Sequence, residues 1–322
     1  MVPARLSSAP LPPLDVSVPP WPGRRVRVGA AELFVRATPG GGEPALLVHG
    51  LGGASTNWTD FAGQLAPWLA IEALELPGFG RSGPAPDRDY SIEAHAGTVT
   101  RYLDQSARGP VHLFGNSMGG VISILIAAQR PDLVRSLTLT SPAVPDLRPK
   151  RLRVDPMLAF ALVPGTGGVI RRRIVRYPAD ARAQAVIGLC LADPSRVPPN
   201  RLAEAVEEIE LRDGYSWSTD ALLRSLRGLV RTYLVTGRRS LWTRMAGIRA
   251  PTLVVWGGRD RLVDVALAPR VARTIPGARL LLLPDVGHVA QLEDPVTTAR
   301  AALALLEDVR RVDRAAEEGV AP

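Results

Sequence analysis

The feature of this sequence that most restricts its fold is a series of short apolar segments separated by helical patterns. The apolar segments are Ala45–Val48, Ala70–Leu76, Val111–Phe114, Val134–Leu139, Thr252–Trp256 and Arg279–Leu283. Segments of this length and composition are typical of strands buried on both faces of a parallel sheet. The helical patterns are Ser91–Gln105, Met118–Gln129, Val263–Thr274 and Pro295–Val309. Strands that alternate with helices predict an α/β fold with a mostly parallel sheet flanked by helices and right-handed crossovers.

This alternation stops near residue 141 and resumes at Pro251. The intervening residues contain helical patterns, most clearly Ala203–Leu211 and Thr219–Val230, and no convincing strand. An insertion of roughly 100 residues has the size of a small domain. We therefore expect a helical cap inserted into an α/β core. The predicted units are a core of residues 24–141 and 250–310 and a cap of residues 142–249.

The two ends of the chain differ from this core. Residues 1–23 include six prolines between Pro3 and Pro20 and no apolar segment of the kind found in signal peptides. We predict a disordered Pro-rich arm there. Residues 311–322 are charged, and we predict a frayed tail. No apolar run reaches the ~20 residues that a membrane-spanning helix needs, so we expect a cytoplasmic protein.

Composition narrows the classes of partner. The chain of 322 residues is 46% hydrophobic and 22% charged, which is typical of a globular protein. It carries 39 Lys and Arg against 31 Asp and Glu, a net charge of +8. Such a charge favours nucleic acid or an anionic membrane surface, but no nucleic-acid-binding motif accompanies it, and we expect no nucleic-acid partner. We interpret the basic clusters Arg148–Arg153 and Arg171–Arg173 as an ordinary solvated face of the cap. The alternatives are binding of a carboxylate substrate and a weak contact with an anionic membrane surface. A single cysteine, Cys190, excludes an internal disulfide and a cysteine-based metal site.

The clearest chemical motif is Gly115-Asn116-Ser117-Met118-Gly119. It follows the apolar strand Val111–Phe114 and begins a predicted helix at Met118. In this strand–turn–helix context a G-x-S-x-G sequence indicates a nucleophile elbow, in which a strained turn exposes the serine hydroxyl above the sheet. Larger side chains two residues before or after the serine would collide with the neighbouring strand and helix. Ser117 is therefore the predicted nucleophile.

A serine hydroxyl needs a base to act as a nucleophile at neutral pH. The chain has four histidines, His49, His95, His112 and His288. His112 lies within a strand, and His95 lies on a helix, where we expect a surface or half-buried structural position. His49 ends the first core strand. His288 follows the last strand, in a loop at the carboxyl edge of the sheet, where active sites of α/β proteins lie, so it is the predicted base.

The base in turn needs a carboxylate that fixes its tautomer. Asp260 follows the strand Thr252–Trp256 and is expected at the same edge of the sheet as His288. We assign it as the acid. Asp146 is the alternative, and Asp264 is a weaker one.

Acyl transfer also requires donors for the oxyanion. The backbone N–H of Met118, directly after the nucleophile, is one expected donor. The second is expected from the loop His49-Gly50-Leu51-Gly52-Gly53, with the N–H of Leu51 as the best candidate. On this interpretation His49 shapes the loop and is not a second base. Gly50, Asn116 and Trp58 are predicted to line the substrate site, and for Trp58 a core position is an equal alternative.

Together these residues resemble the α/β-hydrolase superfamily over about Arg25 to Leu306. The nucleophile, acid and base occur in the order of that superfamily, and the stretch Leu76–Ser82 is a habitual loop of it. Gly115–Gly120 and Gly287–Glu293 look like the meta-cleavage-product hydrolases and related carboxylesterases. Two departures are Leu51-Gly52-Gly53-Ala54-Ser55, where that family has a Gly-Gly-Gly-Pro-Gly type of loop, and Val289, where it has tryptophan.

The resemblance implies a serine hydrolase with a Ser117–His288–Asp260 triad and a helical cap, which needs no metal or organic cofactor. We expect it to cleave carboxylic esters of apolar acyl or aromatic small molecules through an acyl-enzyme. The alternatives are a C–C bond hydrolase of the meta-cleavage-product type, an acyltransferase, and a ligand-binding hydrolase fold with little turnover. Nothing in the sequence sets the oligomeric state.

Overall fold

The computed structural model describes residues 2–146 and 160–318 of the chain. Its centre is a nine-stranded sheet in the order β1-β9-β8-β7-β6-β4-β5-β3-β2. The hairpin of β2 and β3 and the pair β3 and β5 are antiparallel, and all other neighbours are parallel. The strands are β1 (Val2–Pro3), β2 (Gly23–Val28), β3 (Ala31–Ala37), β4 (Glu43–Val48), β5 (Leu69–Leu74), β6 (Val111–Asn116), β7 (Val134–Thr140), β8 (Thr252–Gly257) and β9 (Arg279–Leu283).

The six predicted core strands are β4 to β9, each within two residues of its expected ends. Four of them, β4, β6, β7 and β8, lie side by side in the middle of the sheet. Their residues are almost all buried, and β6 and β8 are buried along their whole length. Burial on both faces explains why these segments are continuously apolar rather than alternating.

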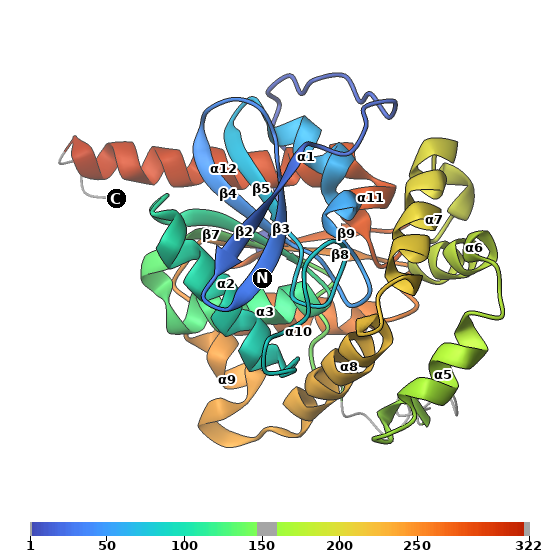
Figure 1. Ribbon diagram of the computed structural model, residues 1–322. Helices are drawn as coiled ribbons and strands as arrows, with labels where there is room; N and C mark the ends of the chain where they lie inside the picture. The colour runs from blue at the N-terminus through green and yellow to red at the C-terminus, as the bar shows by residue number, and fades with distance from the viewer. Residues whose placement is uncertain (1, 147–159, 319–322) are drawn as a thin grey trace.

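Helices cover both faces of the sheet (Figure 1). One face packs against α2, α3, α9 and α10, and the other against α1, α11 and α12. This layered arrangement confirms the predicted α/β class. The helices of the two layers are α1 (Thr59–Leu65), α2 (Ile92–Ser106), α3 (Met118–Gln129), α9 (Leu241–Ala246), α10 (Ala268–Thr274), α11 (Ala290–Glu293) and α12 (Pro295–Glu317).

Between β7 and β8 the described residues form helices and no strand. The helices that precede α9 are α5 (Gly167–Ile174), α6 (Ala179–Cys190), α7 (Pro199–Asp213) and α8 (Ser218–Leu234). They lie to one side of the sheet, with α5 and α6 furthest from it (Figure 1). We refer to this insertion as the cap. The predicted helices Ala203–Leu211 and Thr219–Val230 fall inside α7 and α8.

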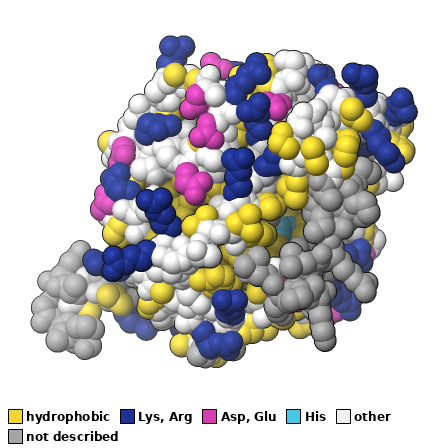
Figure 2. Space-filling view, turned by 90° about the horizontal axis from the view of Figure 1, so that it is seen from below, with side chains coloured by type: hydrophobic (Ala, Val, Ile, Leu, Met, Phe, Trp, Pro, Cys, Tyr) yellow, Lys and Arg dark blue, Asp and Glu magenta, His cyan; other side chains and the backbone are white. Residues whose placement is uncertain are grey.

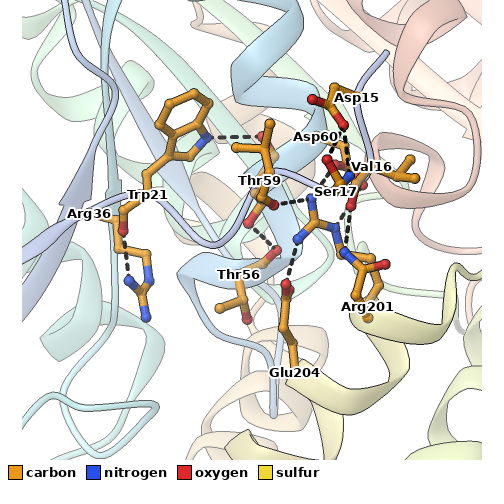
Figure 3. A network of polar contacts seen from close by, with 12 residues as sticks. Asp15, Val16, Ser17, Trp21, Arg36, Thr56, Thr59, Asp60, Arg201 and Glu204 are labelled. Atoms are coloured by element: carbon orange, nitrogen blue, oxygen red, sulfur yellow. Dashed lines mark hydrogen bonds and ion pairs between the residues drawn. The ribbon is translucent and has the colours of Figure 1, made fainter.

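The N-terminal arm differs from the disordered segment that we expected. Its first residues form β1, which pairs with β9 at the sheet edge. Further along, Trp21 Nε1 donates to the carbonyl of Thr59 at 3.0 Å, and Arg201 of the cap donates to the carbonyl of Val18 at 2.8 Å. Arg201 also pairs with Asp60, so one side chain joins arm, core and cap (Figure 3). Proline removes backbone donors, but here the arm's carbonyl oxygens find partners elsewhere in the chain.

At the other end, α12 continues to Glu317, beyond the point at which we expected a frayed tail, and residues 319–322 lie outside the described set. Part of the extension is explained by Asp313, which pairs with Arg135 of β7. Among the described residues, none of the helices combines the length and the apolar character required to cross a bilayer.

Candidate active site

Ser117 lies in the sharp turn between β6 and α3. Its backbone angles are φ 54° and ψ −116°, outside the regions that a residue with a Cβ normally adopts. The turn is held because the N–H of Ser117 donates to the carbonyl of Thr140 at 3.0 Å, and the N–H of Ala143 donates to the carbonyl of Ser117 at 3.1 Å. A residue that its neighbours hold in a strained backbone conformation is typical of a functional site.

The glycines around Ser117 are required by close packing. A Cβ at Gly115 would lie 2.5 Å from both the carbonyl oxygen of Gly119 and the hydroxyl of Ser123. A Cβ at Gly119 would lie 2.2 Å from the carbonyl oxygen of Val48 in β4. These separations are far below van der Waals contact, so the helix can approach the sheet this closely only without side chains at these positions.

His288 and Asp260 are paired. Nδ1 of His288 lies 2.8 Å from Oδ2 of Asp260, and the two side chains are 4% and 0% exposed. The second carboxylate oxygen, Oδ1, accepts from the N–H groups of Leu262 and Val263 at 2.8 and 2.9 Å. Because both oxygens have partners, the carboxylate is fixed in position. A neutral imidazole that donates from Nδ1 presents Nε2 as a proton acceptor.

The elbow and the histidine loop are joined by Asn116. Its Nδ2 donates to the carbonyl of His288 at 3.2 Å and to the carbonyl of Thr140 at 3.1 Å. Gly50 reaches the same place, since a Cβ there would lie 3.1 Å from Cβ of Ser117 and from Oδ1 of Asn116. The structure therefore brings together the elbow, the histidine loop and the glycine loop after β4.

His49 is held by the backbone at both ring nitrogens. Nε2 accepts from the N–H of Leu76 at 3.0 Å, so the proton is on Nδ1, which donates to the carbonyl of Gly50 at 2.7 Å. Burial lowers the pKa of His49 to about 4, and the ring is neutral at pH 7. These contacts agree with our interpretation of His49 as a residue that shapes the loop.

A cap residue also holds this loop. Arg212 of α7 donates from Nη1 to the carbonyl of Gly52 at 2.6 Å. Leu222 of α8 approaches the same glycine, with Cδ1 at 3.5 Å from where a Cβ would stand. Leu51 is half-buried and Met118 is fully buried. The loop that carries Leu51 is therefore held by the cap, whereas Met118 lies in the core at the start of α3.

Figure 2 shows a histidine in a hollow, with apolar side chains beside it among the residues that the structure describes. Trp58, which we expected to line the substrate site, lies instead in the core. It is 1% exposed and packs edge-on against Phe61, with ring centroids 5.6 Å apart. The alternative that the sequence left open, a core position, is the one observed.

The other two histidines are structural. His95 is 1% exposed, which corrects our expectation of a surface or half-buried position. Its Nε2 lies 2.9 Å from the hydroxyl of Ser225 in the cap, and burial lowers its pKa to about 3. His112 contacts Ser136 at 2.7 Å and Glu43 at 2.9 Å, and burial lowers its pKa.

The alternative acids have other surroundings. Asp264 caps the 3₁₀ turn Val265–Leu267, where its Oδ1 accepts from the N–H of Ala266 at 3.0 Å. Asp146 lies near Tyr233 and raises the pKa of that phenol, although burial is the larger cause. In the described parts of the chain, no group of three or more His, Cys, Asp or Glu side chains is placed to bind a metal ion.

Sequence reasoning missed Glu293, a buried carboxylate that joins the histidine loop to the cap. It accepts from the N–H of Gly287 at 2.7 Å, of Ala192 at 3.1 Å and of Asp193 at 2.9 Å. The available signals were its position five residues after His288 and its place at the end of the stretch Gly287–Glu293, and neither indicated a role for its side chain.

A backbone contact strengthens this junction. The N–H of His288 donates to the carbonyl of Cys190, at the end of α6, at 2.6 Å. The Cys190 thiol is a poor nucleophile at neutral pH, because burial raises its pKa to about 11.

Two basic cap clusters were singled out in the sequence. Residues 148–153 lie outside the described part of the chain. In the second cluster, Arg171 turns inward and donates to the carbonyl of Asp213 at 3.0 Å, whereas Arg172 and Arg173 are exposed.

Residues 44–295 match the model of a family described by the alpha/beta hydrolase fold. Two curated relatives are similar to the chain over 79% of its length. The first, the dihydrolipoyllysine-residue acetyltransferase component of the acetoin cleaving system of Cupriavidus necator, is 30% identical. The chain spans only 61% of that relative's length. The second, a 2-hydroxy-6-oxononadienedioate/2-hydroxy-6-oxononatrienedioate hydrolase of Pseudomonas putida, is 26% identical, and 84% of it is covered.

Among solved structures, a bacterial membrane phospholipase A superposes with a TM-score of 0.72. It is 26% identical to the chain, and the match covers 90% of this chain and 86% of the phospholipase.

Proposed function

The chain belongs to the α/β-hydrolase family, and from that premise we propose that it is a serine hydrolase of carboxylic esters. The observation that carries the proposal is the buried pair of His288 and Asp260, whose loop Asn116 joins to the strained turn of Ser117. A nucleophile, a base and an orienting carboxylate are the three groups that acyl transfer to a serine requires.

The proposed reaction has two halves. Ser117 Oγ attacks the ester carbonyl as Nε2 of His288 takes its proton, and the tetrahedral oxyanion is held by the N–H groups of Leu51 and Met118. Collapse of the intermediate breaks the C–O bond, and His288 protonates the departing alkoxide. Water then attacks the acyl-enzyme with His288 again as base, which releases the acid and restores Ser117.

The surroundings of these groups support the assignment. The N–H of Met118 is in the first turn of α3, where the helix dipole favours negative charge. The loop of Leu51 is fixed on the core side by His49 and on the cap side by Arg212. Donors fixed in advance are worth more for an oxyanion than donors that must reorganise. Gly50 and Asn116, which lie against Ser117, are proposed to border the substrate.

A second candidate is hydrolysis of a C–C bond in a vinylogous diketone acid, because a relative bears the name of such a hydrolase. The same three side chains serve both reactions. The sequence after Gly50 and the residue after His288 depart from that family, which favours the ester substrate.

The test is turnover of p-nitrophenyl esters with acyl chains from acetate to palmitate, beside Ser117→Ala. We expect a burst and steady turnover that the variant lacks, and the preferred chain length measures the apolar site. Turnover of a coloured dienone in place of esters would favour C–C cleavage. Product formed only when an alcohol or amine acceptor is added would indicate an acyltransferase, as the name of another relative suggests. Saturable binding of an ester without formation of product would instead indicate a ligand-binding role.

We further propose that the substrate is a small apolar molecule and that the protein is cytoplasmic. Cell fractionation with an antibody against the chain tests the location.

A further inference from the structure

The outer face of the cap carries large apolar side chains in contact with water. We call it the α5–α6 surface, and it is formed by helices α5 and α6 and the turn between them. Its apolar members are 46% to 58% exposed. These residues are Val169, Val175, Tyr177, Val186 and Leu189.

Arginines are interspersed among these apolar side chains. Residues 167–190 contain five arginines and a single acidic residue, Asp180. Two of the arginines are engaged in the cap, since Arg171 donates to the Asp213 carbonyl and Arg182 pairs with the Asp213 carboxylate. The other three are exposed, and within residues 2–146 and 160–318 none of them forms an ion pair. They are Arg172, Arg173 and Arg176.

This combination is unusual for a water-facing helix pair. Several exposed apolar side chains on two successive helices and the turn between them favour a site that another phase or molecule covers. Unpaired arginines beside them select an occupant that is both apolar and anionic. A membrane interface with acidic headgroups has both properties: headgroup charge attracts the guanidinium groups, and the acyl boundary accepts valine, leucine and tyrosine.

The position of the surface relative to the active site adds a second argument. Helix α6 has 12 residues, so its ends are about 18 Å apart. It begins in the α5–α6 surface and ends at Cys190, whose carbonyl accepts from the N–H of His288. Helix α6 therefore connects the α5–α6 surface to the histidine loop through this backbone hydrogen bond. Figure 1 shows both helices at the margin of the molecule, and Figure 2 shows apolar and basic side chains together on the cap side of the hollow.

We propose that the α5–α6 surface docks on an anionic lipid surface and so presents the active site to esters dissolved in that surface. This inference rests on the proposed function for its choice of substrate, lipid esters. A second copy of the chain is a less suitable occupant, because two arginine-rich surfaces of the same sign would face each other.

The experiment measures sedimentation of the protein with two kinds of vesicle. One kind contains phosphatidylcholine alone, and the other contains one part phosphatidylserine to two parts phosphatidylcholine. We expect the wild-type protein to sediment with the anionic vesicles only. A basic residue near an anionic surface is worth about a fivefold change in partitioning, so R172Q/R173Q/R176Q should lose about 100-fold.

A matched variant, R27Q/R101Q/R273Q, removes the same charge from exposed arginines on β2, α2 and α10. It should retain most of the binding. V169S/Y177S tests the apolar part of the surface and should weaken binding without any change in net charge. Equal losses in the two arginine variants would refute the proposal, because net charge alone would then explain the attraction. The proposal would equally be refuted by dimers that the α5–α6 variants abolish in the absence of lipid.

Turnover of a short, water-soluble p-nitrophenyl ester keeps this test separate from the proposed function. None of the substituted residues belongs to the catalytic groups, so all variants should hydrolyse that ester at the wild-type rate. Loss of vesicle binding with intact turnover supports docking. Wild-type turnover without any vesicle binding overturns docking and leaves the serine hydrolase standing. Vesicle binding without turnover of any ester would support docking and refute the proposed serine hydrolase function.

Discussion

Replacing Asp260 by asparagine should disable the proposed base while leaving the fold intact. In the structure, Oδ1 accepts two backbone N–H groups, from Leu262 and Val263, and Oδ2 faces Nδ1 of His288. An asparagine keeps the two backbone bonds only if its oxygen takes the place of Oδ1. Its NH₂ group then points at Nδ1, which must accept rather than donate. The ring proton moves to Nε2, and His288 can no longer take the proton of Ser117.

The size of the expected loss follows from this change of tautomer. In serine proteases the same replacement lowers kcat by about 10⁴, which is about 5 kcal/mol of transition-state stabilisation. The assay is kcat on a p-nitrophenyl ester, with active sites counted from the burst and thermal unfolding as the check on folding. Asp264→Asn is the matched control and should show no comparable loss. A mild effect of Asp260→Asn, together with a large one of Asp264→Asn or Asp146→Asn, would refute the assignment of the acid.

Three further predictions concern stability and the cap junction. Gly119→Ala places a methyl group against the carbonyl oxygens of Val48 and His49 and should lower the free energy of unfolding by about 1–3 kcal/mol in urea titration. Gly168→Ala should not lower it, because a Cβ at Gly168 would lie in open space. Equal losses of unfolding free energy in the two variants would contradict the close packing inferred at Gly119. Glu293→Gln leaves one of three backbone donors facing an NH₂ group, so it should lower the free energy of unfolding by about 1–3 kcal/mol and also lower kcat. If both values were unchanged, the contacts of Glu293 would not support the histidine loop. His49 and His95 have pKa values lowered by burial to about 4 and about 3, so the unfolded chain binds protons that the folded chain does not. The contribution of these histidines to the free energy of unfolding is therefore complete above pH 6.5, the unshifted pKa of histidine. As the pH falls to 4, His49 alone lowers the free energy of unfolding by about 3 kcal/mol. A free energy of unfolding that stays constant between pH 6.5 and pH 4, measured by urea titration, would contradict this prediction.

The core was predictable because its signals are local. A strand buried on both faces must be apolar throughout, so β6 and β8 can be recognised from their own residues without knowledge of the neighbouring strands. The turn at Ser117 is equally local, since the glycines on either side of it are dictated by contacts within the strand–turn–helix unit and with β4. His288 and Asp260 follow from the rule that loops at the carboxyl ends of parallel strands meet.

The features that sequence reasoning did not reach depend on distant partners. His95 is buried in contact with Ser225, which is 130 residues away in the sequence, and with the ring of Phe79. The arm is held by carbonyl contacts with Arg201 in the cap, and carbonyl groups carry no sequence signal. Glu293 bonds three N–H groups, two of them in the cap, and any residue except proline could supply such a group.

In the proposed reaction, Ser117 carries the acyl group during turnover. The most direct test is mass spectrometry of the intact protein, quenched in acid within the burst phase of p-nitrophenyl ester hydrolysis. We predict one added acyl mass, located by peptide mapping on Ser117 and absent from Ser117→Ala. Turnover of the ester by the folded protein with no acyl mass on Ser117, or with undiminished rate in Ser117→Ala, would contradict the account.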